Sequence, residues 1–352
     1  MSQGATKTAV VLFNLGGPDN LAAVRPFLFN LFNDHAIIGV PQPLRWCLAR
    51  LISGRRAAFA RAIYREIGGA SPLLEQTEAQ ARALEAALGD DARVFIAMRY
   101  WHPFAEATAR AVKAFAPDEI VLLPLYPQFS TTTTGSSLDE WRRAAAYVRL
   151  GVPTRVVGCY PTAPGLIAAQ ARLIDRAISK AITETGAVPR LLLSAHGLPK
   201  KIVARGDPYQ WQVERTAAAI VEALAAPPYG RTDLDWTVCY QSRVGPLEWI
   251  GPPTDGEIRR AGGEGRALVV APIAFVSEHS ETLVELDIEY RKIAEETGVP
   301  TYARVPALGT VTEFIEQLAE LVRAARAGPA SHTGARLCPT AFDKCRCVEN
   351  AP

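Results

Sequence analysis

Residues 191–199, LLLSAHGLP, decide the fold. Three leucines run into Ser-Ala without polar alternation, a pattern typical of a parallel strand that helices cover on both faces. His196 closes the run, after which Gly197 permits a close backbone approach and Pro199 fixes the turn. The segment therefore predicts a buried parallel strand that carries a histidine at its carboxyl end.

Apolar runs of this kind recur along the chain and form two sets of four. We expect the strands near residues 8–13, 94–98, 120–123 and 155–158, and then near 191–194, 237–240, 267–270 and 302–305. The segments between them are rich in Ala, Leu, Glu and Arg with helical periodicity, as in EQTEAQARALEAAL at 75–88. The sequence thus predicts an α/β protein of two similar doubly wound, Rossmann-type domains, each with a four-stranded parallel sheet.

The length of 352 residues suits about two domains, each with its own core. We place the first domain at residues 1–153 and the second at 154–326. Residues 327–352 have the composition of an extension beyond the fold, and they hold half of the six cysteines. VLLPLYPQFS and LVVAPIAFVS share the order aliphatic strand, proline, aromatic, serine, which hints at a duplication.

Charge and the N-terminal residues exclude several classes of protein. A net charge of +2 without a long Lys/Arg run argues against nucleic acid as a partner. The first apolar run ends at Gly-Gly-Pro and no basic region precedes it, so we expect a strand and neither a signal peptide nor a membrane span. We therefore expect a cytoplasmic protein, in which clustered cysteines more often bind metal than form disulfides.

Ligands of open α/β sheets bind at the carboxyl ends of the strands, so the residues after each run are the candidates for chemistry. His196 is placed there to move protons near neutral pH, although a histidine packed under a loop would give the same sequence. After the seventh run, Glu278, Glu281, Glu285 and Glu289 are spaced three, four and four apart, which stacks carboxylates on one face of an α-helix. This face is either a solvated acidic surface or a path for a cation or protons.

Three other strand ends carry polar or aromatic residues. Arg99 and Tyr100 follow the second run, YPQFSTTTTGSS (126–137) follows the third, and Trp249 lies in a Gly/Pro-rich loop after the sixth. Ser137 with Glu140 matches a helix-capping box, so we interpret that serine as a cap. Together the strand ends predict a cleft with aromatic walls, an arginine, a histidine and a column of carboxylates, suited to a flat apolar ligand with acid groups and to a metal cation.

The chain closely resembles the ferrochelatase family, which inserts Fe(II) into protoporphyrin IX. The resemblance rests on eight segments in order along the chain: NLGGPD, YREIGGASPL, MRYWHPF, YPQFSTTTTGSS, SAHGLP, RGDPY, YQSRVGPLEWIGPPTD and PIAFVSEHSETLVELDIEY. It implies two chelatase-like α/β domains, protoporphyrin IX and Fe(II) as substrates, and protohaem as the product.

The resemblance also implies roles for single residues. His196 would accept pyrrole protons or meet the metal, with Glu281 as its partner carboxylate. Glu278 and Glu285 would continue the iron path. The porphyrin walls would be formed by Arg99, Tyr100, Tyr126, Ser130 and Trp249.

Residues 44–69, LRWCLARLISGRRAAFARAIYREIGG, form a basic amphipathic segment. In the family this region is a lip over the pocket, and its apolar face can touch a membrane. The alternative is an ordinary surface helix packed on the body. Peripheral membrane contact and a homodimer are both compatible with the sequence.

The C-terminal stretch CPTAFDKCRC holds Cys338, Cys345 and Cys347. From the residues alone it could be a disulfide staple, a metal or iron–sulfur site, or an unstructured tail. The resemblance implies a [2Fe–2S] cluster on these three cysteines, with Cys159 as the best fourth ligand, although four thiolates would also suit zinc. Animal members take their fourth ligand from the segment that matches YPQFSTTTTGSS, which has no cysteine here.

Three alternatives to protoporphyrin metallation stay open at this point. The first is a chelatase for coproporphyrin III or for another tetrapyrrole. The second is an iron–sulfur redox carrier, and the third is a tetrapyrrole-binding protein without chemistry.

Overall fold

The computed structural model describes residues 6–90, 92–243, 245–328 and 337–345. The chain folds into two compact units. Unit 1 runs to Cys159 and includes Leu318 to the end of the last helix, together with residues 337–339 and Cys345. Unit 2 comprises Tyr160–Gln317 and Thr340–Lys344.

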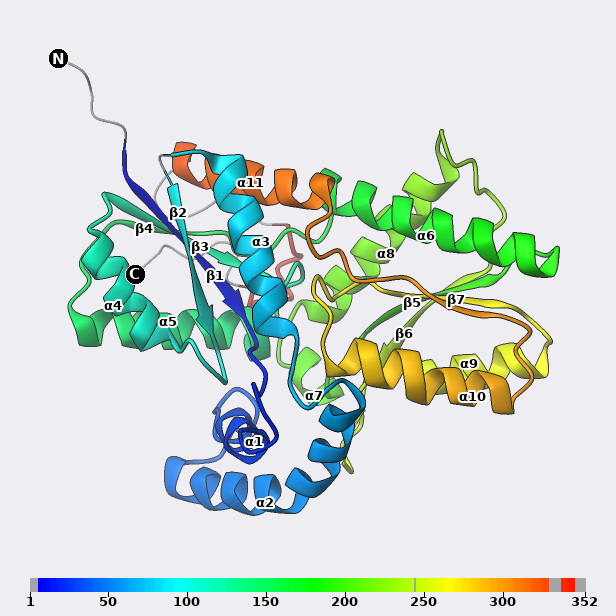
Figure 1. The fold of residues 1–352 in the computed structure, drawn as a ribbon, viewed down its shortest axis with the longest axis horizontal. Coiled ribbons are helices and arrows are strands. Elements are labelled where there is room, and N and C mark those ends of the chain that lie inside the picture. Colours follow the sequence, from blue (N-terminus) through cyan, green and yellow to red (C-terminus); the bar gives the residue numbers. More distant parts are fainter. Residues whose placement is uncertain (1–5, 91, 244, 329–336, 346–352) are drawn as a thin grey trace. The chain divides into compact units, whose positions relative to one another are not determined.

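Unit 1 is built on a parallel sheet with the strand order β2-β1-β3-β4. Its strands are β1 (Thr8–Asn14), β2 (Ala92–Met98), β3 (Glu119–Pro124) and β4 (Thr154–Val156). Helices α4 (Ala105–Phe115) and α5 (Ser136–Val148) cover one face, where Val11 and Phe13 pack with Trp141. Figure 1 shows α3 (Leu73–Leu88) crossing in front of this sheet.

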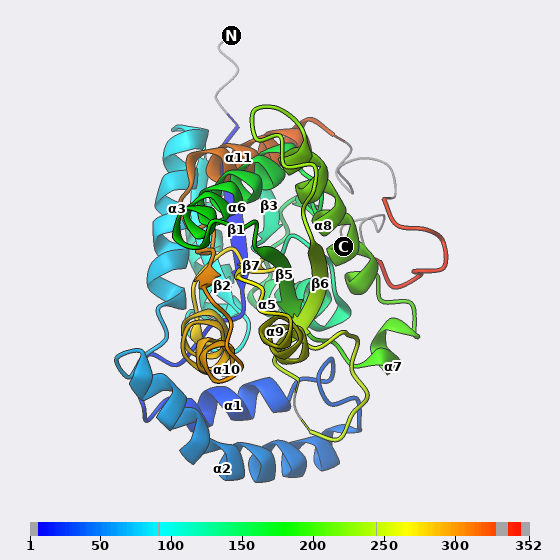
Figure 2. The same cartoon turned by 90° about the vertical axis from the view of Figure 1, so that its right-hand side faces the viewer.

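Unit 2 repeats this topology with the order β6-β5-β7-β8, again all parallel. Its strands are β5 (Arg190–His196), β6 (Trp236–Gln241), β7 (Leu268–Pro272) and β8 (Tyr302–Arg304). Successive β5 side chains are buried against opposite layers: α6 (Pro164–Thr185) and α8 (Tyr209–Ala225) on one face, α9 (Thr254–Gly263) and α10 (Tyr290–Glu296) on the other. Figure 2 shows these two layers on either side of the strands. The predicted fold of two four-stranded parallel sheets is confirmed.

A π-helix follows the third strand of each sheet. These helices are η1 (Thr131–Gly135) after β3 and η2 (Glu281–Glu289) after β7. The acidic segment was expected to be an α-helix, and this expectation was wrong over Glu281–Glu289. Hydrogen bonds from i to i+5 widen the turn, and π-helical turns, which are rare, occur frequently at functional sites.

The unit boundaries differ from the predicted domain boundaries at both ends of the second domain. A boundary at residue 153 would cut off β4, which pairs with β3 (Ile120 opposite Thr154) and so completes the first sheet. The last helix, α11 (Thr312–Ala327), is divided between the units. In unit 1, Arg326 donates to the buried Glu119 at 2.7 Å.

The remaining helices of unit 1 are α1 (Val24–Phe32) and the long α2 (Gln42–Glu66), which contains most of the basic amphipathic segment. Unit 2 also contains the short α7 (Lys200–Val203) directly after the loop that follows β5. Within the described residues, no helix combines the length and the apolarity that crossing a bilayer requires.

Candidate active site

His196 and Glu281 meet at the point of unit 2 where the strand order reverses. His196 is the last residue of β5, and Glu281 begins η2 shortly after β7, the neighbouring strand. The Nε2 atom of His196 lies 3.4 Å from Oε1 of Glu281. The connections after β5 and β7 leave toward opposite faces, and such a switch point is where doubly wound sheets bind ligands.

The two side chains are placed to form an ion pair when His196 is protonated. Nδ1–H of His196 donates to the carbonyl oxygen of Gly197 at 2.6 Å, which turns Nε2 toward Glu281. Burial lowers the pKa of His196, but the Glu281 carboxylate outweighs it and raises the pKa to about 9. Burial likewise raises the pKa of Glu281, but His196 outweighs it and lowers the pKa to about 2. Since the side chains are 40% and 30% exposed, an incoming ligand can reach the pair.

A second imidazole contacts the same carboxylate. Nε2 of His279 lies 3.7 Å from Oε2 of Glu281, and the ring of His279 packs edge-on against Phe275. Burial lowers the pKa of His279, although Glu281 raises it in part. Glu281 therefore lies between two imidazoles, and carboxylates and neutral imidazoles are ligand types that suit borderline cations such as Fe(II). His196 would have to lose its proton before it could bind one.

Glu285 is the carboxylate of this site that most readily holds a proton. Burial raises its pKa, and the negative charge of Glu281 raises it further. Its oxygens accept hydrogen bonds from the Gln241 amide at 3.1 Å, from the Ser242 N–H at 2.8 Å and from the Tyr290 hydroxyl at 2.8 Å. The Ser242 hydroxyl also donates to Glu285.

Sequence reasoning missed these hydrogen-bond donors. Gln241 ends β6 and Ser242 follows it, so the rule applied to the other strand ends would have found both. Ser242 has a φ of 60°, an uncommon conformation for a residue with a side chain. That conformation occurs where both the N–H and the hydroxyl of Ser242 reach Glu285.

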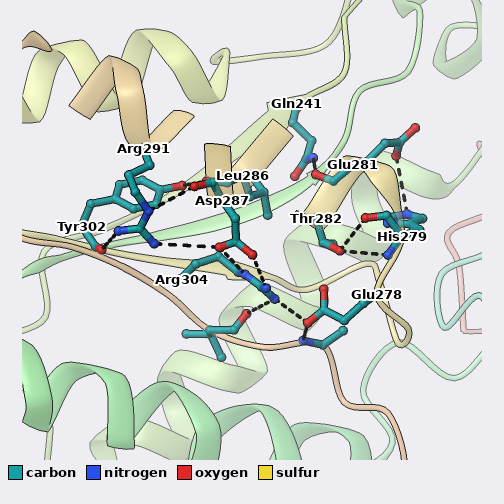
Figure 3. Close-up of polar contacts among 12 residues, drawn as sticks. Gln241, Glu278, His279, Glu281, Thr282, Leu286, Asp287, Arg291, Tyr302 and Arg304 are labelled. Carbon is teal, nitrogen blue, oxygen red and sulfur yellow. Dashed lines mark hydrogen bonds and ion pairs between the residues drawn. The ribbon is translucent and has the colours of Figure 1, made fainter. Parts of the chain in front are cut away.

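Glu278 does not continue the row of carboxylates as expected. It accepts hydrogen bonds from Arg304 and from the Ala307 N–H, and Arg304 also pairs with Asp287 (Figure 3). Burial raises the pKa of Glu278, but Arg304 outweighs it and lowers the pKa. Glu278 is therefore held by Arg304, although its charge also raises the pKa of His279, and its place on the iron path stays a prediction. Arg304, another residue at a strand end, was also missed.

Trp249 borders a groove of about 620 Å³ on unit 2, together with Lys200, Arg243 and Ile250. Its indole Nε1 is buried and has no hydrogen-bond partner among the residues that the structure describes. A Cβ at Gly197 would lie 2.9 Å from the Gln241 carbonyl oxygen and 3.2 Å from Trp249 Cε3, so the glycine permits this packing. This position is compatible with the predicted wall.

The four predicted porphyrin residues of unit 1 are largely engaged in its interior. Arg99 pairs with Asp34 at 2.9 Å, and the fully buried Tyr100 donates to the same carboxylate at 2.7 Å. Burial raises the pKa of Tyr126. Ser130, only 1% exposed, accepts from the Thr132 N–H and caps η1. That these residues touch a porphyrin stays a prediction.

The interpretation of Ser137 as a helix cap was wrong. Helix α5 begins at Ser136 as a continuation of η1, and no side chain caps its first turn. The Ser137 hydroxyl is buried near Tyr126, whose pKa it lowers in part, and no backbone N–H of the described residues donates to it.

The cysteines fall into distinct environments. Cys338 and Cys345 are each 3% exposed, whereas most residues between them are exposed, and Cys159 belongs to the same unit. Cys239 is buried in β6, where burial raises its pKa to about 12. Cys347 lies outside the described residues. Within those residues, no group of three or more His, Cys, Asp or Glu side chains is arranged to hold a metal ion.

Comparison with known proteins identifies the family. The family model described as ferrochelatase matches residues 7–326. The chain belongs to the ferrochelatase family. Ferrochelatases from Caulobacter vibrioides and Phenylobacterium zucineum are 59% and 58% identical to it, over 98% and 97% of this chain and 99% and 98% of the relatives. The ferrochelatase of Pelagibacter ubique is 47% identical over 97% of this chain and 99% of the relative.

Solved structures show that the ferrochelatase-family chain has the fold of other chelatases. SirB from Bacillus subtilis, solved with Fe3+, superposes with a TM-score of 0.52 at 12% identity, covering 91% of this chain and 96% of SirB. DR2241 from Deinococcus radiodurans, described as similar to chelatases, superposes with a TM-score of 0.50 at 15% identity, covering 92% of this chain and 55% of DR2241. The predicted chelatase-like fold is confirmed.

Replacing Glu281 by Gln should lower the pKa of His196. The carboxylate raises this pKa against the effect of burial, so its removal should bring the pKa from about 9 to below the ordinary value near 6.5. A titration of the imidazole followed by NMR measures the shift. Glu289→Gln is the control, because Glu289 is exposed on the same helix. A His196 pKa that stays near 9 in Glu281→Gln would contradict the ion pair.

Proposed function

We propose that this chain inserts Fe(II) into protoporphyrin IX to form protohaem, with His196 and Glu281 as the catalytic residues. The proposal depends above all on the contact of 3.4 Å between these side chains at the switch point of unit 2. Fe(II) and the porphyrin are both substrates, so the site must bind a cation and accept protons in one reaction.

Metal insertion releases two protons from the pyrrole nitrogens for each Fe(II) that enters. Glu281 raises the pKa of His196 to about 9, which favours the imidazolium at neutral pH. A divalent cation at Glu281 would offset the negative charge that stabilises the imidazolium, so His196 would release its proton to solvent. Neutral Nε2 of His196 could then accept one of the two pyrrole protons, and the other would go to Glu285 or to solvent.

Glu285 supports the removal of protons from the site. Burial and Glu281 raise its pKa, so it can take up a proton at a pH where an exposed glutamate would be charged. It shares Gln241 with Glu281, because the Gln241 amide donates both to the Glu281 carbonyl at 3.0 Å and to the Glu285 carboxylate. The acid path of this proposal therefore consists of Glu281 and Glu285. Glu278 accepts a hydrogen bond from Arg304, and the proposed path does not require it.

Binding energy from the rest of the macrocycle would distort the ring. A planar porphyrin hides its nitrogen lone pairs from an ion, and bending exposes them. We assign the wall contacts to the predicted residues Arg99, Tyr100, Tyr126, Ser130 and Trp249. The groove beside Trp249 on unit 2 supports this assignment for the tryptophan.

Replacing His196 by Ala should reduce kcat for Fe(II) insertion by about 100-fold or more and leave porphyrin binding intact, because the proton acceptor is lost. We would follow the porphyrin absorption bands anaerobically, with protoporphyrin IX and coproporphyrin III in parallel. His35→Ala is the matched control, since His35 belongs to unit 1 and contacts Arg45 there.

Each outcome of this assay bears on the proposal. Full turnover by His196→Ala would contradict the role of the histidine. Metallation of coproporphyrin III alone by the wild type would replace the proposed substrate with that porphyrin. If the wild type metallates neither, the chain is not the proposed enzyme.

We further propose that Cys159, Cys338, Cys345 and Cys347 hold a [2Fe–2S] cluster. The tail buries Cys338 and Cys345 while most of the residues between them are exposed, which supports a role for both thiols as ligands. Cys159 is disulfide-bonded in the structure, so the proposal requires its reduction to a thiolate. Four thiolates are the usual ligands of such a cluster. The cluster would supply a one-electron redox centre and would fasten the tail.

Replacing Cys338 by Ser should remove the brown colour of anaerobically purified protein and most of its iron and acid-labile sulfide, since one of the four ligands is lost. Absorption spectra and metal analysis measure this. Cys47→Ser should keep the colour, because Cys47 is an exposed residue of α2. A colourless wild type that contains zinc would show that the four thiolates hold zinc.

Helix α2 supports a proposal of peripheral membrane contact. Leu44, Leu51 and Phe59 are 53%, 47% and 61% exposed, and their spacing places them on one face with Arg55. Apolar side chains beside arginines on a surface helix are typical of binding to anionic lipid surfaces. A homodimer stays a prediction.

Replacing Leu51 and Phe59 by Ser should weaken binding to vesicles that contain phosphatidylglycerol, because the variant has less apolar surface to bury in lipid. Co-sedimentation measures the bound fraction. Val188→Ser, an exposed residue of unit 2, is the control. Wild-type protein that does not sediment with these vesicles would contradict the proposal.

A further inference from the structure

The described part of the C-terminal tail packs on the turn that begins α8. The ring of Phe342 lies 6.1 Å from that of Trp211, and the Lys344 N–H donates to the Gly206 carbonyl at 3.3 Å. Thr340–Lys344, Gly206 and Trp211 all belong to unit 2. This segment, Thr340–Lys344, is called the strap below.

The strap can lie against Gly206 because this residue has no side chain. A Cβ at this position would lie 2.0 Å from the Asp343 Oδ1 atom and 3.3 Å from its backbone nitrogen, so any side chain would displace Asp343. Gly206 also has a φ of +93°, which residues with side chains rarely adopt. The RGDPY segment therefore provides both a turn and a contact surface for the tail.

The same turn supports His196. The Asp207 carboxylate accepts the Tyr209 N–H at 2.9 Å and so holds the start of α8. Tyr209 packs in the core cluster of unit 2 with Ala195 and Leu198, the residues on either side of the His196–Gly197 pair. The strap therefore contacts the start of α8 at Trp211, and the segment that carries His196 packs in the same cluster as Tyr209 of that turn.

Buried cysteines flank the strap on both sides. Cys338 and Cys345 are 3% exposed, and most of the residues between them are exposed. A short peptide loses less conformational entropy on docking when both of its ends are already fixed. Anchored cysteines would therefore favour the contact of Phe342 and Asp343 with α8.

We propose that the strap fixes the first turn of α8 and thereby positions His196 against Glu281. Phe342 and Asp343 are then positioning residues, which act through Trp211, Gly206 and Tyr209. Replacing Cys338 or Cys345 would therefore slow turnover although His196 and Glu281 themselves are unchanged. The inference rests on the proposed function in one respect: it takes His196 to be catalytic.

Two variants with matched controls test the strap. Phe342→Ala removes the ring contact, and Leu337→Ala is its control, since Leu337 is an exposed tail residue outside the strap. Gly206→Ala displaces Asp343, and Gly230→Ala is its control. Gly230 also has a positive φ, but a Cβ there would meet nothing within 4 Å. Circular dichroism checks that each variant is folded.

Hydrogen exchange and an NMR titration of His196 are measured on full-length protein without porphyrin. We expect the amides at the start of α8 to exchange about tenfold faster in Phe342→Ala and Gly206→Ala than in the wild type and both controls. The pKa of His196 should fall, because its contact with Glu281 loosens. The kcat for metal insertion should fall with it, at an unchanged KM for porphyrin.

Two results would overturn the proposal. Wild-type exchange in both variants would show that the strap does not hold the turn. Faster exchange with an unchanged His196 pKa would show that the turn does not position the histidine.

Cys345→Ser should also accelerate exchange, and normal exchange there would refute the anchoring role of the cysteines. Since exchange and titration need no turnover, a wild type without chelatase activity would refute the proposed function and leave this test intact.

Discussion

The pairing of a partly exposed imidazole with a carboxylate is the constraint on which the site depends. Burial opposes the charged form of both His196 and Glu281, and each side chain shifts the pKa of the other in the direction that favours its charge. The pair exists because two adjacent parallel strands end side by side and send their connections to opposite faces. The strand order therefore brings the two side chains together. Neighbouring groups such as His279 and Glu285 also have shifted pKa values beside this pair.

The two units share a strand order and a π-helix at the same position, but the side chains on that π-helix differ. Each has a π-helix after the third strand of a sheet with the same strand order. In unit 1 the π-helix is a run of threonines capped by Ser130, and in unit 2 it begins with Glu281 and contains Glu285. A widened helical turn at the carboxyl end of a strand thus carries neutral hydroxyls in one unit and carboxylates in the other.

The sequence was sufficient for the strands, their parallel arrangement and the position of His196, because continuous apolar runs and the residues that follow them are local signals. It was not sufficient for the partners of the acidic residues. Spacing on an assumed α-helix placed Glu278 beside Glu281. In the structure Glu278 accepts a hydrogen bond from Arg304, which lies 26 residues further along the chain at the end of β8. Such pairings depend on which strand ends are neighbours, and the spacing along one helix does not contain that information. The π-helical turn was missed for a related reason, since it has no distinct composition.

Arg304 has a consequence for how long a cation remains in this region. Carboxylates retain divalent cations more tightly as their number around the ion increases. Arg304 holds Glu278 and Asp287 in ion pairs, and its single positive charge offsets one of their two negative charges. In the proposed function Glu281 and Glu285 would then be the acids that serve the site around His196, and the pKa of Glu285 is itself raised. A full acidic cage would retain an ion more tightly, whereas this partly compensated segment would hold a metal for a shorter time before handing it on.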